Sequence, residues 1–235
     1  MPYDLPAFAR LRRRLQRGKH PRPSIIKWMW IDRAGWPFVL GALVIAVGVG
    51  LWFGRAWSVP FLVLAAFFLF FFRDPERHPP QGANLVISPA DARVMVAGAE
   101  TWPGAPAGEW KVISMFLSPM DVHINRTPVA GTVKRVEYHP GKFLPAYKKE
   151  AGELNEWTEV LIDGPRGPVV VRQIVGILAR RIVCRLSPGD QVSAGERYGV
   201  MKFGSRIDLF LPRTATILVK AGDKVVGGET TLATY

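Results

Sequence analysis

The sequence predicts a mainly β domain, a barrel or sandwich with lipoyl-like elements, preceded by an N-terminal apolar helical hairpin. Two long uncharged apolar runs predict the hairpin, and short β-branched segments separated by Gly, Pro and Asp predict the β domain. A chain of 235 residues allows one domain of ordinary size and an appendage. We expect a basic leader over 1–35, the hairpin over 36–72 and the β-rich domain over 73–235.

The leader carries more than half of the net charge of +12. Its basic residues are opposed only by Asp4 and Asp32; they are Arg10, Arg12, Arg13, Arg14, Arg17, Lys19, Arg22, Lys27 and Arg33. Such a leader fits a nucleic acid or an anionic membrane surface. The apolar runs that follow favour the membrane, where each well-placed basic residue contributes about 1 kcal/mol. We therefore expect an anionic lipid surface as a partner and no nucleic acid.

The hairpin consists of WPFVLGALVIAVGVGLWFG (36–54) and AWSVPFLVLAAFFLFFF (56–72), separated by Arg55. Each run reaches the roughly 17 residues that a helix needs to cross a hydrocarbon core. Two arrangements fit: a tight pair of spanning helices, or a hairpin that dips into one leaflet. In both, the outer ends share a side, and arginines on both flanks place that side in the cytoplasm. The expected location is the cell (inner) membrane, with the β domain on its cytoplasmic face.

The β domain contains an internal repeat. SPGDQVSAGE (187–196) and KAGDKVVGGE (220–229) share the pattern G-D-x-V-x-x-G-E at a spacing of 33 residues. A strand-turn unit used twice is what the two halves of a lipoyl-type barrel would show. Asp190 and Asp223 are therefore expected to be turn residues rather than catalytic ones.

The residues that could carry chemistry are few. Cys184 is the only cysteine, so one chain can form neither a disulfide nor a cysteine-based zinc site. There is no phosphate loop, dinucleotide glycine fingerprint, zinc-protease helix or lipase elbow. An enzyme built from this inventory needs an electrophile of another origin.

Two titratable residues stand out. His123 lies in MFLSPMDVHINRTPVAG (115–131), where strand alternation puts Asp121, His123 and Asn125 on one face. A structural histidine and a general base are equally compatible with that position. Asp91 follows a proline in VISPADARV (86–94), and taken alone it is a turn residue.

The run GVMKFGSRIDLFLP (199–212) interrupts an apolar, strand-like pattern with Gly204-Ser205-Arg206. A bulge or kink would explain the interruption, and so would a backbone that is to be cut there.

Together these pieces resemble the phosphatidylserine decarboxylase family, in the short form found in many bacteria and related to archaeal archaetidylserine decarboxylases. The matching motifs run in the expected order from Phe71 to Thr231. They are FFRDPERHPP, SPADARV, FLSPMDVHINRTPVAGTV, GILARRIVC, GDQVSAGERYGVMKFGSRID and VKAGDKVVGGETTLA. The combination is specific, whereas no single motif would be.

The resemblance implies that the chain cuts itself between Gly204 and Ser205, giving a large chain 1–204 and a small chain 205–235. Ser205 would become a covalent pyruvoyl group, the only cofactor expected, and no metal is implied. That carbonyl would form a Schiff base with phosphatidylserine and accept the electrons released with CO₂, yielding phosphatidylethanolamine. A pyruvoyl cofactor made from the chain fits the missing cofactor motifs.

The resemblance also implies an Asp-His-Ser relay for self-cleavage. Asp91 matches the aspartate of the relay, and His123 aligns with the first of two histidines found in many members. Arg126 occupies the position of the second histidine, which is the usual relay member. Either His123 does both jobs or another base is used, and Arg126 is a candidate to bind a substrate carboxylate or phosphate.

Two other functions remain open from the sequence. The repeat also fits a membrane-anchored lipoyl-like adaptor without catalysis, and a pyruvoyl enzyme could act on another amino acid. The sequence leaves the oligomeric state open, homo-oligomers included.

Overall fold

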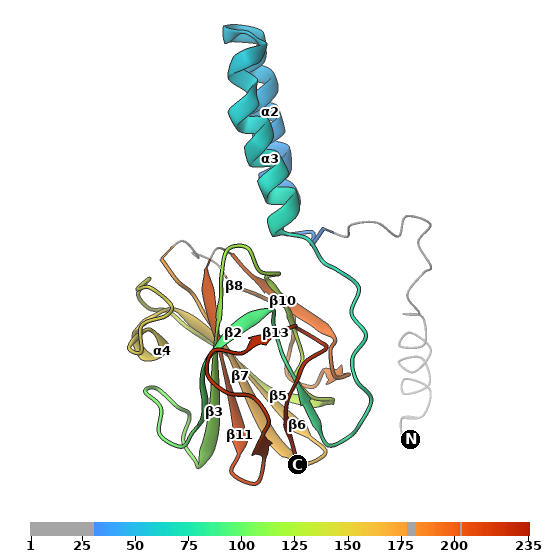
Figure 1. Ribbon diagram of the computed structural model, residues 1–235, viewed down its shortest axis with the longest axis vertical. Coiled ribbons are helices and arrows are strands. Elements are labelled where there is room, and N and C mark those ends of the chain that lie inside the picture. Colours follow the sequence, from blue (N-terminus) through green and yellow to red (C-terminus); the bar gives the residue numbers. More distant parts are fainter. Residues whose placement is uncertain (1–30, 178–181, 203) are drawn as a thin grey trace, which may run out of the picture.

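The computed structural model describes residues 31–177, 182–202 and 204–235. Most of the basic leader predicted over 1–35 lies outside the described residues. The remainder consists of a pair of helices and a β domain from which the helices project (Figure 1).

The apolar runs form helix α2 (Trp36–Phe53), a 3₁₀ turn (Arg55–Ser58) and helix α3 (Val59–Phe71). The two helices run antiparallel side by side, and Gly54, with a φ of 97°, closes α2. The 18 residues of α2 span about 27 Å and are apolar enough to cross a membrane, whereas α3 is shorter. Large side chains near the tip face outward, with Leu51 84% and Trp52 85% exposed.

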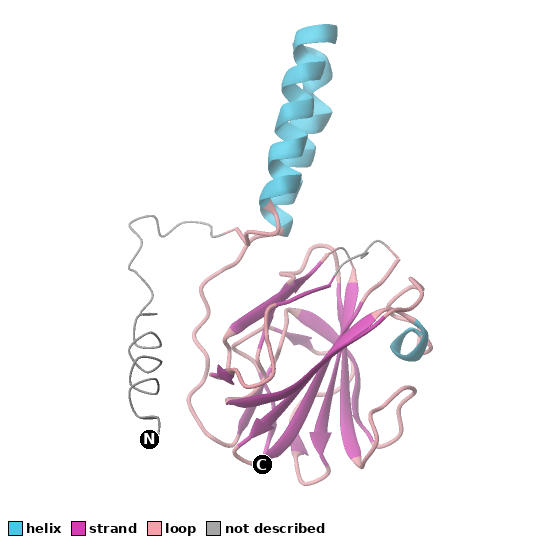
Figure 2. Ribbon diagram, turned by 180° about the vertical axis from the view of Figure 1, so that it is seen from behind, coloured by secondary structure: helices cyan, strands magenta, loops and turns pink. Residues whose placement is uncertain are grey.

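The β domain is built on one curled antiparallel sheet and two small sheets (Figure 2). The large sheet has the order β13 (Lys224–Val225), β2 (Ala92–Ala99), β3 (Trp110–Leu117), β11 (Ser205–Pro212), β7 (Gly167–Ile174), β6 (Trp157–Gly164), β5 (Gly131–His139) and β9 (Gln191–Val192). The small sheets are β1 (Leu85–Ile87), β14 (Thr231–Thr234) and β12 (Thr216–Ile217), and β4 (Ile124–Arg126), β10 (Arg197–Met201) and β8 (Ile182–Cys184). One short helix, α4 (Ala151–Leu154), lies in the connection before β6. The predicted mainly β class with preceding helices is confirmed, and the large sheet forms a half-barrel.

The core lies on the concave side of the half-barrel. Alternate residues of the central strands point into it, such as Ile113 and Met115 from β3 and Ile207 and Leu209 from β11. These residues are almost fully buried, so the two central strands are fixed in register by the apolar face that they share.

The repeated motifs form the same turn twice. Asp190 accepts a hydrogen bond from the backbone N–H of Ser187 at 2.8 Å, and Asp223 accepts one from Lys220 at 2.9 Å. The next strands, β9 and β13, lie at opposite edges of the large sheet. Both aspartates are turn residues, as predicted.

The base of the helix pair packs directly against the β domain. Phe71 and Phe72 are fully buried with Val122, Ile124 and Val200, which belong to β4, β10 and the loop before them. One guanidinium nitrogen of Arg185, Nη2, donates to both carboxylate oxygens of Asp32, at 2.7 and 2.8 Å. The hairpin is therefore anchored at the end of the domain where β11 begins, rather than hanging from a loose linker.

Candidate active site

The Gly204–Ser205 bond lies at the start of β11, whose first residue is Ser205. Gly204 has a φ of 69°, a left-handed conformation that costs glycine little and other residues more. Ser205 pairs with Leu117 of β3 and shares the core-facing side of β11 with Ile207 and Leu209. Its side chain is fully buried, and its Oγ has no hydrogen-bond partner among the residues that the structure describes. A buried hydroxyl without a partner is costly in a purely structural role, so this one is a candidate for chemistry.

The carbonyl of Gly204 is pressed against Gly176, which follows β7. A Cβ placed on Gly176 would lie 2.1 Å from the Gly204 oxygen and 3.3 Å from the Cβ of Ala146. Only a residue without a side chain permits this approach, so Gly176 helps to define where the Gly204 carbonyl sits.

His123 is fully buried immediately before β4. Its Nδ1 lies 3.0 Å from the backbone oxygen of Asp121, an acceptor, so we assign the proton to Nδ1 and the lone pair to Nε2. The ring packs on Phe71 of α3 with centroids 4.2 Å apart, and Nε2 is buried with no hydrogen-bond partner in the described part of the chain. Burial, assisted by the charge of Arg73, lowers the pKa of His123 to about 4. The imidazole is therefore neutral near pH 7 and able to accept a proton.

His123 also lies close to the segment that leads to the scissile bond. Its backbone oxygen accepts a hydrogen bond from the N–H of Met201 at 3.2 Å. Further along that segment, the ammonium of Lys202 lies 4.8 Å from the centre of the Phe38 ring of α2. The hairpin thus touches both the candidate base and the segment to be cut.

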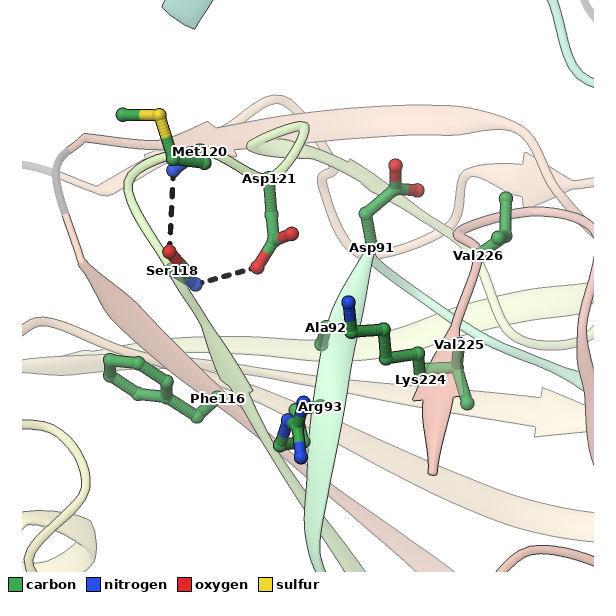
Figure 3. A pocket seen from close by; sticks show the side chains of 10 residues that line it. All are labelled: Asp91, Ala92, Arg93, Phe116, Ser118, Met120, Asp121, Lys224, Val225 and Val226. Atoms are coloured by element: carbon green, nitrogen blue, oxygen red, sulfur yellow. Dashed lines mark hydrogen bonds between the residues drawn. The ribbon is translucent and has the colours of Figure 1, made fainter. Parts of the chain in front are cut away.

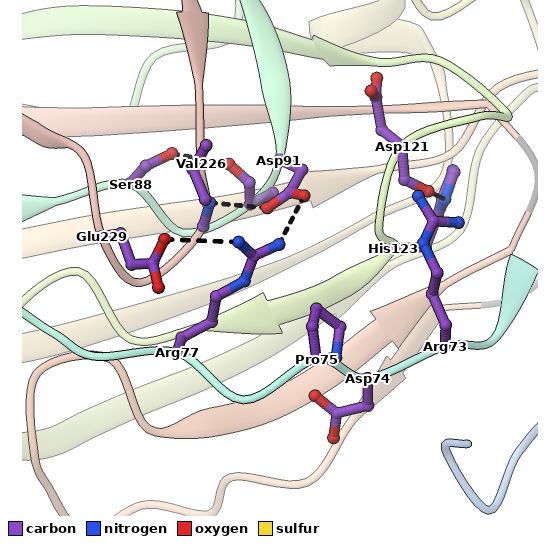
Figure 4. Close-up of polar contacts among 12 residues, drawn as sticks. Arg73, Asp74, Pro75, Arg77, Ser88, Asp91, Asp121, His123, Val226 and Glu229 are labelled. Atoms are coloured by element: carbon purple, nitrogen blue, oxygen red, sulfur yellow. Dashed lines mark hydrogen bonds and ion pairs between the residues drawn. The ribbon is translucent and has the colours of Figure 1, made fainter. Parts of the chain in front are cut away.

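Asp91 lies at the start of β2, one strand beyond β3. Arg93 pairs with Phe116, and Phe116 pairs with Arg206, so β2 and β11 begin at the same end of the sheet, about 10 Å apart. One carboxylate oxygen accepts from Arg77 at 2.8 Å and the other from the N–H of Gly227 at 2.8 Å (Figure 4). Burial raises the pKa of Asp91, although both of these contacts act against the shift.

The structure thus brings Asp91, His123 and Ser205 to one end of the domain without joining them in a hydrogen-bonded chain. Among the described residues, His123 contacts the Asp121 carbonyl and Asp91 contacts Arg77 and Gly227. The relay remains a prediction.

Arg126 is buried, and three of its five N–H donors are used. The guanidinium donates to the oxygens of Gly195 at 3.1 Å, Asp74 at 3.1 Å and Pro75 at 3.0 Å. Burial, reinforced by the charge of Arg197, lowers its pKa. These contacts clamp the segment after α3 onto β4.

A pocket of about 620 Å³ opens beside Asp91 (Figure 3). Its polar lining comes from the ends of β2 and β3 and from β13, and includes Asp91, Ser118, Asp121, Arg93 and Lys224. Ser118 donates its N–H to Asp121 at 2.7 Å, which fixes that carboxylate. Neither His123 nor Ser205 belongs to the lining.

Comparison with known proteins places the chain in a family. The model of the family described as phosphatidylserine decarboxylase matches residues 64–233. A phosphatidylserine decarboxylase proenzyme of Polynucleobacter asymbioticus is 42% identical over 214 residues, which cover 91% of this chain and 96% of that protein. One of Symbiobacterium thermophilum is 45% identical over 204 residues, 86% of this chain and 94% of that protein. The chain belongs to the phosphatidylserine decarboxylase family.

Membership of the phosphatidylserine decarboxylase family decides between the functions left open by the sequence. The chain is the proenzyme of a carboxy-lyase, and its cofactor is a pyruvoyl group that it generates from itself. A non-catalytic adaptor is excluded.

Sequence reasoning missed several residues around this decarboxylase site. Gly176 and Phe71 lie in the motifs GILARRIVC and FFRDPERHPP, which served only as signatures. Arg77, the partner of Asp91, lies in the second of them. Because Arg77 follows an apolar run, its sequence position is typical of an arginine at the membrane interface. Its spacing does not indicate that it pairs with Asp91.

Proposed function

We propose that the chain cleaves itself between Gly204 and Ser205, and that it then decarboxylates phosphatidylserine to phosphatidylethanolamine at the pyruvoyl group formed from Ser205. The observation that supports the proposal is the conformation and surroundings of the Gly204–Ser205 peptide bond. Gly204 is in a left-handed conformation with its carbonyl against Gly176, and the adjacent Ser205 hydroxyl is buried with no partner in the segments that the structure describes. In a family of proenzymes, that arrangement is a nucleophile next to its target carbonyl.

Self-cleavage proceeds through the chain's own atoms. Ser205 Oγ attacks the Gly204 carbonyl carbon, the C–N bond breaks, and the amide becomes an ester. A base then removes the Ser205 Cα proton, and β-elimination expels the Gly204 carboxylate. Water converts the remaining dehydroalanine, through its imine, into pyruvoyl and ammonia. His123 is the base that we propose, because its Nε2 carries a lone pair at neutral pH and because its backbone contacts Met201.

The site fits a pyruvoyl group. The group would replace Ser205 at the buried start of β11, and its formation would remove a hydroxyl that has no hydrogen-bond partner among the described residues. When formed, the group would supply an electrophilic carbonyl for the substrate amine and an electron sink for the pair released with CO₂. We propose that His123 and Asp91 transfer the protons. The His123 imidazole is neutral near pH 7, and burial raises the pKa of the Asp91 carboxyl.

The two fragments are expected to remain together after cleavage. β11 lies in the middle of the large sheet, between β3 and β7, and the later strands β13 and β14 pair with β2 and β1. The small chain 205–235 is therefore held at several separate places by strands of the large chain 1–204.

We also propose that the hairpin holds the site at the cytoplasmic face of the cell membrane, against anionic lipids. Its outward apolar side chains need lipid around them, and α2 is long enough to cross a bilayer. A lipid substrate then reaches the domain from the same side as the hairpin. The two repeated turns at opposite sheet edges support the finer proposal of lipoyl-like halves.

The experiment compares the full chain with Ser205→Ala in detergent and in phosphatidylserine vesicles. The wild type should give two fragments, the smaller lacking an ordinary amino terminus, and should release CO₂ from the lipid. Ser205→Ala should remain one chain of 26.1 kDa and release none. An intact wild-type chain, or CO₂ released from free amino acids but not from the lipid, would overturn the proposal.

A further inference from the structure

The junction between hairpin and β domain holds several arginines, and most of them are neutralised. Ion pairs with carboxylates hold four of them in place: Arg77 with Asp91 and Glu229, Arg126 with Asp74, Arg197 with Asp74, and Arg185 with Asp32. Arg73 lies in the same junction and has no carboxylate partner among the residues that the structure describes. Its charge is therefore not neutralised by a direct ion pair, whereas those of its neighbours are.

Arg73 is nevertheless held in a fixed position. Its guanidinium donates to the backbone oxygen of Phe70 at 2.8 Å and to that of Met120 at 2.7 Å. It also lies over the Phe70 ring, 3.9 Å from the ring centre. Two of its five N–H donors are used in these contacts, so others are left for a ligand. An arginine that is held in place and has unused N–H donors can bind an anion such as a carboxylate or a phosphate.

The position of Arg73 suits a lipid headgroup. It follows α3 by two residues, at the depth where an apolar helix gives way to the polar surface of a bilayer. It lies on the same side as the candidate site, beside Asp121 and His123 (Figure 4). Its charge acts on His123, and the charges of Asp91 and Asp121 act on it, so all three are within electrostatic reach.

We propose that Arg73 binds the phosphodiester group of the phosphatidylserine substrate. This inference rests on the proposed function and adds the residue that recognises the lipid phosphate. The phosphate is a better ligand for Arg73 than the seryl carboxylate, because an ion pair would stabilise the carboxylate against leaving as CO₂. The phosphate does not change in the reaction, so Arg73 contributes equally to binding before and during it. Arg126 is less suited to this role, because it is buried and its guanidinium already pairs with Asp74.

The test uses Arg73→Ala and Arg73→Lys in the full chain, with self-cleavage checked by electrophoresis. Vesicles contain phosphatidylserine diluted into phosphatidylglycerol, so that the total negative charge is constant. Arg73→Ala should raise KM for phosphatidylserine about 10- to 100-fold with little change in kcat, and Arg73→Lys should recover part of the loss. A long-chain O-acyl ester of serine, which has the amine and carboxylate but no phosphate, should be decarboxylated equally by wild type and Arg73→Ala. Arg213→Ala, which removes a surface charge paired with Glu100 and Glu109, is the matched control.

A second measurement does not depend on self-cleavage. In the Ser205→Ala background, Arg73→Ala should weaken binding of soluble glycerophosphoserine and leave binding of serine unchanged. An unchanged KM for phosphatidylserine, an equal loss on both substrates, or unchanged glycerophosphoserine binding would each overturn the proposal. An equally large loss in binding to vesicles of phosphatidylglycerol alone would assign Arg73 to general membrane attraction, which also overturns the proposal. Failure of the wild type to release CO₂ would instead refute the proposed function.

Discussion

Replacing Gly176 by alanine should block maturation without disturbing the fold. The added Cβ would lie 2.1 Å from the Gly204 oxygen, whereas real Cβ atoms essentially never approach another atom closer than 3.0 Å. The Gly204 carbonyl, the group that Ser205 is proposed to attack, and residue 176 must therefore move apart by about 0.9 Å or more. A misplacement of about 1 Å at a reacting centre can lower a rate about 100-fold, which corresponds to about 2.7 kcal/mol in the barrier.

The assay is the time course of conversion of the full chain into fragments 1–204 and 205–235, followed by denaturing electrophoresis and intact mass. Gly48→Ala is the matched control, because a Cβ at that position in α2 meets nothing within 4 Å. Thermal unfolding of both variants in the Ser205→Ala background separates a local displacement from loss of the fold. Cleavage of Gly176→Ala at the wild-type rate would refute the reasoning.

Three further predictions concern the groups around the cleavage site, each measured by urea unfolding in the Ser205→Ala background. Burial lowers the pKa of His123 from 6.5 to about 4, so stability should be complete above pH 6.5 and fall by about 3 kcal/mol as the pH drops to 4. His123→Gln should lack that part of the slope, and an identical pH dependence would contradict the assignment. Arg206→Met should lower the free energy of unfolding by about 3–5 kcal/mol, because it leaves the buried carboxylate of Asp208 without its cation. The double variant Arg206→Met/Asp208→Leu should recover much of this stability, and no recovery would argue against the ion pair. Phe71→Ala should lower the free energy of unfolding by about 3–5 kcal/mol, because the buried Phe71 ring packs the hairpin against His123. A negligible loss of stability would show that the hairpin is not anchored there.

The local features of this protein were readable from its sequence. Helix α2 (Trp36–Phe53) follows the first apolar run almost residue for residue, because an uninterrupted apolar stretch has no other stable conformation at a lipid surface. Asp190 and Asp223 were recognisable as turn residues because their contacts lie within the turn itself. Gly204 and Ser205 were identified through a resemblance carried by several motifs in order, rather than by the two residues alone.

The contacts that make the site were decided only by the tertiary structure. Gly176 meets Gly204, Phe71 meets His123, and Arg77 rather than His123 meets Asp91, each across a long stretch of chain. Sequence spacing fixes which residues share a strand face or a turn, but not which strand becomes the neighbour of another. The carboxylate that pairs with a given arginine depends on which strands become neighbours. From the sequence alone, Arg73 and Arg126 therefore look like similar cations. In the folded chain Arg126 pairs with Asp74, whereas Arg73 donates to the backbone oxygens of Phe70 and Met120, because three-dimensional packing determines which carboxylate lies within reach.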